Sequence, residues 1–131
     1  MNTSRLVHNR DDLGFTDLDR VLPSGIRDEG QICNLISDKL NGAEEFTICW
    51  GRALPGQHHV KHHHTGVAEF YVILAGTPII HLGDEDIRAK PGDAFYIPPM
   101  TTHGYTNDTD EVMELIGGVN SVGTWDFIPD E

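Results

Sequence analysis

Short apolar runs separated by turn-forming residues follow one another along most of this chain. Typical runs are residues 45–53 (EFTICWGRA), 69–76 (EFYVILAG) and 94–99 (AFYIPP), with Gly, Pro or Asn close to their ends. Aromatic and β-branched residues are common in these runs, and no helical period continues through them. Strands are expected there and also at residues 30–38, 77–83, 86–93, 102–107 and 111–119.

Strands this short and this evenly spaced predict an all-β fold, either an antiparallel sandwich or a barrel. The Asn41-Gly42 pair between two runs is typical of a hairpin connection. No linker or repeat divides the chain, so residues 26–131 are expected to form one domain. Residues 1–25 are polar and form an N-terminal arm, either flexible or contributing an edge strand, including one donated to a partner subunit. Within the arm, only residues 15–22 suggest a helical turn.

The charge of the chain restricts its partners. Its 131 residues include 21 acidic and 9 basic side chains, for a net charge of -12. Lys and Arg do not cluster, which argues against nucleic acid and against anionic membrane surfaces. No run reaches the roughly 20 apolar residues that span a bilayer, and the N-terminus lacks the apolar segment of a secretory signal. Cys33 and Cys49 are expected to be buried free thiols, and a cytoplasmic protein is the simplest expectation.

Five histidines lie within residues 58–64, followed by Glu69 in an apolar run. Because side chains alternate across a strand, His62 and His64 share one face and His63 points the other way. Glu69 can join the pair if it lies on the next antiparallel strand with the same inward sense. These side chains would form one side of a metal site. The alternative is a solvated histidine-rich loop.

A fourth ligand must come from elsewhere, and His103 is the best candidate because two prolines hold the backbone shortly before it. Imidazole and carboxylate together suit Fe(II), Mn(II), Ni(II), Co(II) or Zn(II). We expect four of the remaining histidines to play no part in the site, and His8, in the polar arm, is left unassigned. His58, His59 and His63 are expected to be solvated, and His81, with no partner in view, is expected to be structural.

The chain resembles the cupin family in two sequence motifs. The first cupin motif is matched by a glycine, two histidines, a glutamate and a second glycine at Gly56, His62, His64, Glu69 and Gly76. The second motif is matched by Gly92, Pro98, His103 and Asn107. Met100 departs from it, because the family favours glycine at that position.

The resemblance implies a jelly-roll barrel with one metal ion bound by His62, His64, Glu69 and His103. It also implies that the protein is a homodimer with a small-molecule substrate. Fe(II) or Mn(II) is the favoured ion.

Alternation predicts which other side chains line the interior. Tyr71 and Ile73 share the face of Glu69, Tyr105 and Asn107 share the face of His103, and Tyr96 is expected to face the same interior. The three tyrosines are candidates to donate a hydrogen bond to a bound oxygen, with ordinary core packing as the alternative. Glu69 is also a candidate to detach in part from the ion and accept a proton. Trp125 and Phe127 are expected to cover a barrel end or a dimer contact, and the inward face of residues 46–53 is left open.

An oxygenase acting on a small organic molecule is the leading functional hypothesis. Such an enzyme would use the four ligands with Fe(II) or Mn(II). A non-redox isomerase, epimerase, lyase or polyketide cyclase is the second hypothesis, for which Zn(II) or Ni(II) would suffice. A cupin that binds a small ligand without catalysis is the third. The fold does not choose among them.

Overall fold

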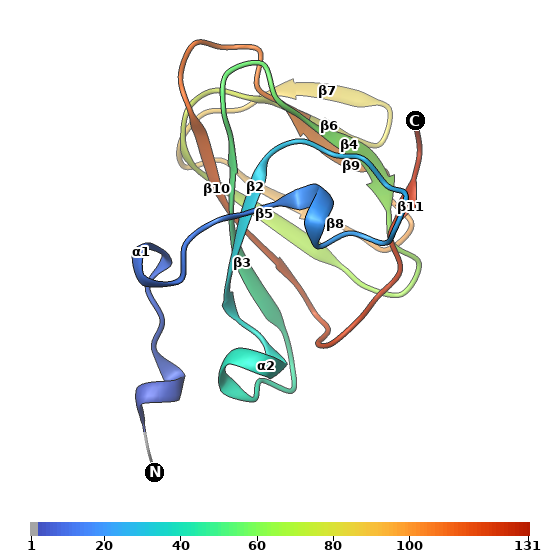
Figure 1. The fold of residues 1–131 in the computed structure, drawn as a ribbon. Coiled ribbons are helices and arrows are strands. Elements are labelled where there is room, and N and C mark those ends of the chain that lie inside the picture. The colour runs from blue at the N-terminus through green and yellow to red at the C-terminus, as the bar shows by residue number, and fades with distance from the viewer. Residues whose placement is uncertain (1–2) are drawn as a thin grey trace.

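Two antiparallel β-sheets face each other in the computed structural model, which describes residues 3–131 (Figure 1). One sheet has six strands in the order β1-β2-β3-β10-β5-β8, and the other has five in the order β11-β4-β9-β6-β7. The strands are β1 Thr16–Asp17, β2 Gln31–Ile36, β3 Thr47–Ala53, β4 His58–His63, β5 Glu69–Ala75, β6 Ile79–Leu82, β7 Glu85–Arg88, β8 Ala94–Ile97, β9 His103–Thr106, β10 Met113–Val119 and β11 Ile128–Pro129. The all-β jelly-roll class expected from the sequence is confirmed.

The helices are short and lie outside the two sheets. They are the 3₁₀ helices η1 (Thr3–Leu6) and η2 (Leu18–Arg20) and the α-helices α1 (Arg10–Leu13) and α2 (Asp38–Asn41). Helix α2 lies in the connection between the antiparallel strands β2 and β3, where the sequence predicts a chain reversal. Its N-cap, Ser37, accepts a hydrogen bond from the main-chain N–H of Leu40. Among the described residues, no helix is long and apolar enough to cross a membrane.

Apolar side chains from both sheets fill the space between them. The buried cluster contains Ala53, Tyr71, Ile73, Ile80, Ala89, Phe95, Ile97, Tyr105, Met113 and Leu115. The sequence leaves open which face of residues 46–53 points inward. On β3, the side chains of Thr47 and Ala53 point inward, whereas Phe46, just before the strand, is 44% exposed, so the face that contains Thr47 is the inner one. Asn107 is buried and donates to the carbonyls of Ala53 and Glu111, so it anchors a turn rather than lining the interior cavity.

The N-terminal arm adds an edge strand to the chain's own sheet. Thr16 and Asp17 of β1 pair with β2, and the expected helical turn is present as η2. Leu18 at the start of η2 is buried and packs over the interior. The arm therefore forms one wall of the barrel mouth. Residues 1–2 of the predicted arm lie outside the described residues.

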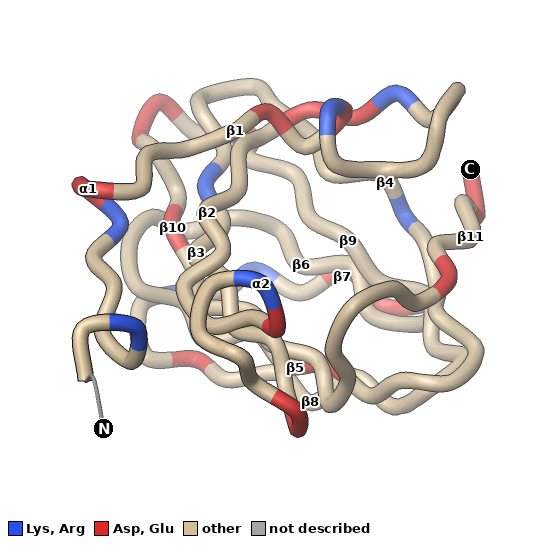
Figure 2. The backbone as a smooth tube through the Cα atoms, turned by 60° about the horizontal axis from the view of Figure 1, so that its bottom comes forward, with Lys and Arg blue, Asp and Glu red and all other residues tan. Residues whose placement is uncertain are grey.

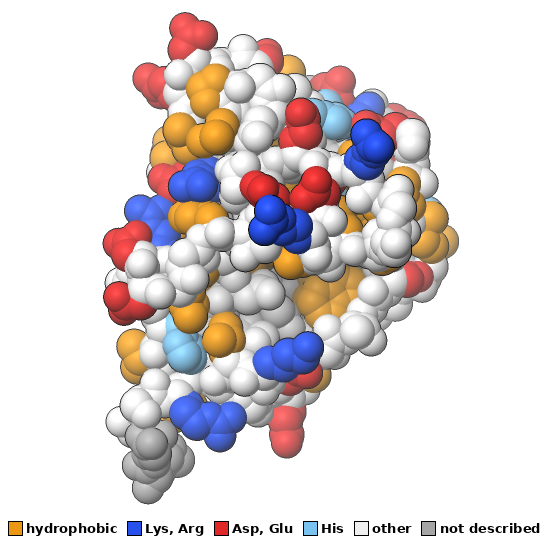
Figure 3. Space-filling model, viewed as in Figure 1, with side chains coloured by type: hydrophobic (Ala, Val, Ile, Leu, Met, Phe, Trp, Pro, Cys, Tyr) orange, Lys and Arg blue, Asp and Glu red, His pale blue; other side chains and the backbone are white. Residues whose placement is uncertain are grey.

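Basic side chains are dispersed over the surface. Lys and Arg form short, separate segments along the backbone, with acidic residues between them (Figure 2). On the face drawn in Figure 3, basic groups are again interspersed with acidic ones. The absence of a nucleic-acid partner stays a prediction, and this distribution supports it.

Candidate metal centre

The first part of the site lies on the neighbouring strands β4 and β9. His62 of β4 is the pairing partner of His103, the first residue of β9. His64 follows the end of β4, and all three imidazoles are at least 95% buried. The short sequence distance between His62 and His64 and the strand pairing with His103 thus bring three ring nitrogens to one place.

Glu69 reaches these histidines from the opposite sheet. It is the first residue of β5, which belongs to the six-stranded sheet, whereas β4 belongs to the five-stranded sheet. The expectation that Glu69 lies on the strand adjacent to the histidines is therefore wrong. The connection at residues 65–68 crosses from one sheet to the other, so the carboxylate faces the imidazoles across the interior.

The four predicted ligands converge on one point. One ligand atom from each of His62, His64, Glu69 and His103 lies within 4.8 Å of all the others. The Nε2 atoms of His64 and His103 lie 3.1 and 3.2 Å from Glu69 Oε1. Among the described residues, this is the one cluster of histidine, cysteine and carboxylate groups with such spacing.

The imidazole rings are held in the orientation that a metal ion requires. Each Nδ1 lies 2.6–2.9 Å from a main-chain oxygen, in the pairs His62–Val60, His64–Asp126 and His103–Thr101. A carbonyl only accepts, so each Nδ1 carries the proton and each Nε2 is free to bind a cation. Three oriented nitrogens and one carboxylate oxygen fit a divalent transition metal ion.

Burial and mutual contacts set the charges of the ligands. Desolvation, together with the neighbouring His59 and His103, lowers the pKa of His62 to about 2, so its ring is neutral and can bind a metal. Burial opposes ionisation of Glu69, but its contacts with His103 and His64 outweigh this effect and hold the pKa of the carboxyl below its usual value. A neutral imidazole and an ionised carboxylate are the forms in which these residues act as ligands.

A cavity of about 510 Å³ opens onto His62, His64 and Glu69. Phe127 lies in its wall, with its ring stacked on His62 at a centroid distance of 4.1 Å and an interplanar angle of 16°. Trp125 also lines this cavity. These aromatic residues are thus part of the site itself, which the sequence did not indicate because β11 pairs with β4 only through the tertiary fold.

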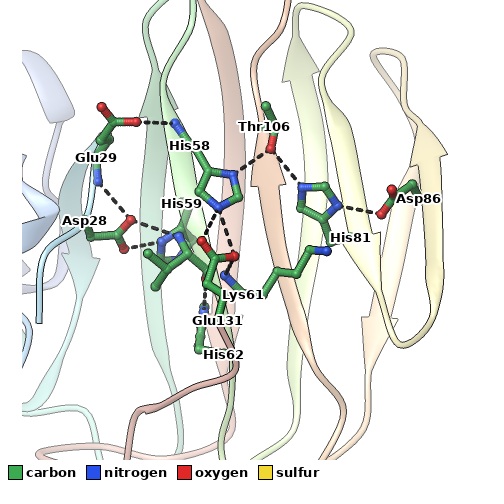
Figure 4. Close-up of polar contacts among 11 residues, drawn as sticks. Asp28, Glu29, His58, His59, Lys61, His62, His81, Asp86, Thr106 and Glu131 are labelled. Carbon is green, nitrogen blue, oxygen red and sulfur yellow. Dashed lines mark hydrogen bonds and ion pairs between the residues drawn. The ribbon is translucent and has the colours of Figure 1, made fainter.

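His59 is buried beside the ligands, contrary to the expectation that it is solvated. A register shift between His59 and His62 in the pairing of β4 with β9 turns both side chains inward. The exposed fraction of His59 is 8%, and its Nδ1 donates to Asp28 Oδ2 at 2.5 Å (Figure 4). Strict alternation cannot predict this arrangement because the bulge adds one residue to β4.

Two of the three candidate tyrosines face the interior. Tyr71 and Tyr105 are each 3% exposed, as alternation predicts. Tyr96 is 68% exposed, because Phe95 and Ile97 on either side of it point inward along β8. The expectation that Tyr96 lines the interior is wrong. Its ring lies on the outer face of the six-stranded sheet.

Three of the histidines outside the site, His58, His63 and His81, have carboxylate partners. His58 Nε2 donates to Glu131 and His63 Nδ1 donates to Asp130. His81, for which the sequence offers no partner, lies 2.6 Å from Asp86 Oδ1 and 2.8 Å from the Thr106 hydroxyl (Figure 4). These residues hold the C-terminal segment and the strand edges together and do not reach the interior.

The fold and this constellation define a cupin barrel with a centre that could hold a metal ion. Residues 51–117 match the family described as the cupin domain, which is 67 of 131 residues. The chain therefore belongs to the cupin family. A relative from Methanocaldococcus jannaschii, an uncharacterized protein, is 28% identical over 92 residues, covering 70% of this chain and 74% of the relative.

Solved structures of proteins whose activities differ from one another share this fold. The polyketide cyclase RemF from Streptomyces resistomycificus superimposes with a TM-score of 0.78 at 18% identity, over 95% of this chain and 84% of that protein. A predicted oxalate decarboxylase from Thermotoga maritima gives 0.74 at 20% identity, over 88% and 99%. A sugar phosphate isomerase from Silicibacter pomeroyi gives 0.65 at 20% identity, over 76% and 66%. Their activities differ, so the shared fold does not choose a reaction for this chain.

Proposed function

We propose that this protein is a metal-dependent enzyme that acts on a small, uncharged organic molecule, and that its reaction is an oxygenation with Fe(II) or Mn(II). The convergence of three oriented imidazoles and one carboxylate on an open cavity carries the proposal. A site closed by four ligands and nothing else would be structural, whereas this one adjoins space for a substrate.

The ion would polarise a substrate oxygen and, if redox-active, support reaction with dioxygen. The chain's own residues supply the remainder of the site. His62, His64, His103 and Glu69 would hold the ion, and Phe127 presents a flat apolar surface beside it. No Lys or Arg is among the described residues that line the cavity, so apart from the ion itself no lysine or arginine there would compensate an anionic group of a substrate.

Oxygen consumption tests the reaction class. Protein reconstituted with Fe(II) or Mn(II) would be screened against uncharged phenols and enols with an oxygen electrode. Turnover that requires dioxygen is the expected result. Identical turnover under aerobic and anaerobic conditions would contradict an oxygenase.

A second candidate is a non-redox isomerase, lyase or cyclase, and the buried His59–Asp28 pair favours it. An imidazole held by a carboxylate beside the ligands is the kind of group that moves a proton in such reactions. Full activity with redox-inert Zn(II) would select this candidate over the oxygenase. Binding without any turnover would instead support a ligand-binding protein. The homodimer stays a prediction.

A further inference from the structure

A small inner chamber lies next to the metal ligands. Its volume is about 70 Å³, and its lining includes Glu69, His59, Tyr71 and Tyr105. A water molecule occupies about 30 Å³ in the liquid, so the chamber has room for one or two small polar groups. Glu69 and His59 also line the larger cavity, so a molecule in that cavity can reach the chamber.

Tyr71, in the lining of the chamber, has a hydroxyl group without a hydrogen-bond partner among the described residues. Its side chain is 3% exposed, and the hydroxyl is buried. Burial and the nearby charge of Glu69 raise the pKa of Tyr71, so the hydroxyl keeps its proton. A buried hydroxyl without a partner costs about 1–3 kcal/mol. A bound ligand with an acceptor atom would remove this cost.

His59 offers the complementary acceptor. Its Nδ1 donates to Asp28 Oδ2, and Asp28 Oδ1 accepts from the main-chain N–H of Val60 (Figure 4). Because the side chain of Asp28 is completely buried and both its oxygens are used, it fixes the proton of His59 on Nδ1. No described residue is hydrogen-bonded to Nε2, which therefore presents a lone pair.

Apart from the hydroxyl of Tyr105, the other polar groups of the chamber are committed. Gln31 accepts from Arg52 through Oε1 and donates to Gln57 through Nε2. Burial raises the pKa of Cys49 to about 12, so it stays a thiol. Glu69 is a metal ligand in the proposed site. His59 is thus the ring nitrogen that remains to accept from a ligand, and Tyr71 is a fully buried hydroxyl that remains to donate.

We propose that His59, positioned by Asp28, accepts a hydrogen bond from a substrate hydroxyl and thereby selects the substrate. The substrate would be an uncharged, largely apolar molecule with an enol or phenol hydroxyl next to the oxygen that binds the metal, and Tyr71 would donate to one of these oxygens. This inference rests on the proposed metal-dependent function. His59 acts here as a specificity-determining residue, independently of whether the reaction uses dioxygen.

Binding of two matched probes to the Zn(II)-loaded protein tests this role without any turnover. The probes are 2,3-dihydroxynaphthalene and its monomethyl ether, which differ by one hydroxyl donor and are followed by fluorescence titration. The wild-type protein is expected to prefer the diol. His59→Phe is expected to reduce the ratio of the two affinities about tenfold, the value of one buried hydrogen bond.

Asp28→Asn provides a second variant with nearly unchanged shape. If the oxygen of the new side-chain amide keeps the bond from Val60, its NH₂ group donates to His59 Nδ1 and moves the imidazole proton to Nε2. The acceptor then becomes a donor, so the preference for the diol should fall by about tenfold or more. His58→Phe, on the same strand but bonded to Glu131 outside the cavity, is the control and should keep the wild-type ratio. A change of this ratio with bound zinc unchanged is not expected from a merely structural residue.

The outcomes separate this inference from the function on which it rests. Zinc-dependent binding with a reduced diol preference in Asp28→Asn supports the role of His59. Zinc-dependent binding with the wild-type ratio in Asp28→Asn and in a folded His59→Phe overturns that role and leaves the metal site intact. Binding of both probes that does not depend on zinc overturns the proposed function and this inference together.

Discussion

The two faces of β4 carry the same residue type in different surroundings. On the inner face, His62 donates through Nδ1 to a carbonyl and leaves Nε2 to converge with the other ligands. On the outer side, His58 and His63 donate to the carboxylates of Glu131 and Asp130. A carbonyl partner keeps an imidazole neutral and oriented, whereas a carboxylate partner makes it one half of an ion pair when it is protonated. The partner, more than the residue type, separates a metal ligand from a structural histidine.

Removal of an inner histidine should have the largest effect. His62→Ala and His103→Ala are each expected to retain less than about one tenth of the wild-type metal, because loss even of an outer-shell partner typically costs about 10- to 100-fold in affinity. Elemental analysis after dialysis measures this. His63→Ala is the matched control and should keep nearly all the metal. A large loss in His63→Ala would show that the division between the two faces is wrong.

The bulge that brings His59 to the inner face depends on close backbone packing at Gly104. A Cβ added there would lie 2.7 Å from the main-chain oxygen of His59 and 3.0 Å from that of Val60. Gly104→Ala is therefore expected to lower the free energy of unfolding by about 1–3 kcal/mol, the usual cost of forcing extra volume into a packed region. Thermal or denaturant unfolding measures the change. Gly66→Ala, with no atom within 4 Å of the added Cβ, should change stability by less than about 0.5 kcal/mol.

The outer ion pairs should respond to acid. Although desolvation opposes it, hydrogen bonds from the main-chain N–H of Lys61 and from His58 hold the pKa of Glu131 below its usual value. A lowered carboxyl pKa stabilises the fold above the unfolded pKa of about 4.3 and loses this effect as the pH falls through the folded value. Glu131→Gln in the metal-free protein should thus lower the free energy of unfolding by less than about 1 kcal/mol at neutral pH, since the pair is partly exposed. The difference should shrink as the pH falls through the lowered pKa of Glu131 in the folded protein, and a difference that grows toward acid would contradict this account.

Met100 is expected to give the smallest change. It adopts φ of 68°, the left-handed region that the cupin glycine would occupy without strain, and its N–H donates to the carbonyl of His64. Relief of about 1–2 kcal/mol of strain in Met100→Gly is partly offset by the greater freedom of glycine in the unfolded chain. The variant should be more stable by less than about 1 kcal/mol in thermal unfolding, with metal content unchanged. A decrease in stability would show that the Met100 side chain contributes contacts that outweigh the strain.

The sequence predicts the ligands better than it predicts their surroundings. The spacing of the two cupin motifs selects His62, His64, Glu69 and His103, and the structure brings these four residues together. The spacing does not show that Glu69 lies across the interior, since that depends on which sheet β5 joins.

The remaining differences have local and non-local causes. The alternation of Phe95, Tyr96 and Ile97 is a local signal that indicates Tyr96 on the outer face, because its two apolar neighbours point inward. His59 and Phe127 could not be assigned in this way, because one depends on a bulge and the other on the return of the C-terminal segment across β4.

X-ray absorption at the metal edge tests the central claim most directly. The claim is that His62, His64, Glu69 and His103 together hold one ion. Zn(II)-loaded protein is expected to show three imidazole nitrogens at about 2.0–2.1 Å and a carboxylate oxygen at about 2.0–2.2 Å. A sulfur neighbour at about 2.3 Å, or fewer than three imidazoles, would contradict the proposed centre.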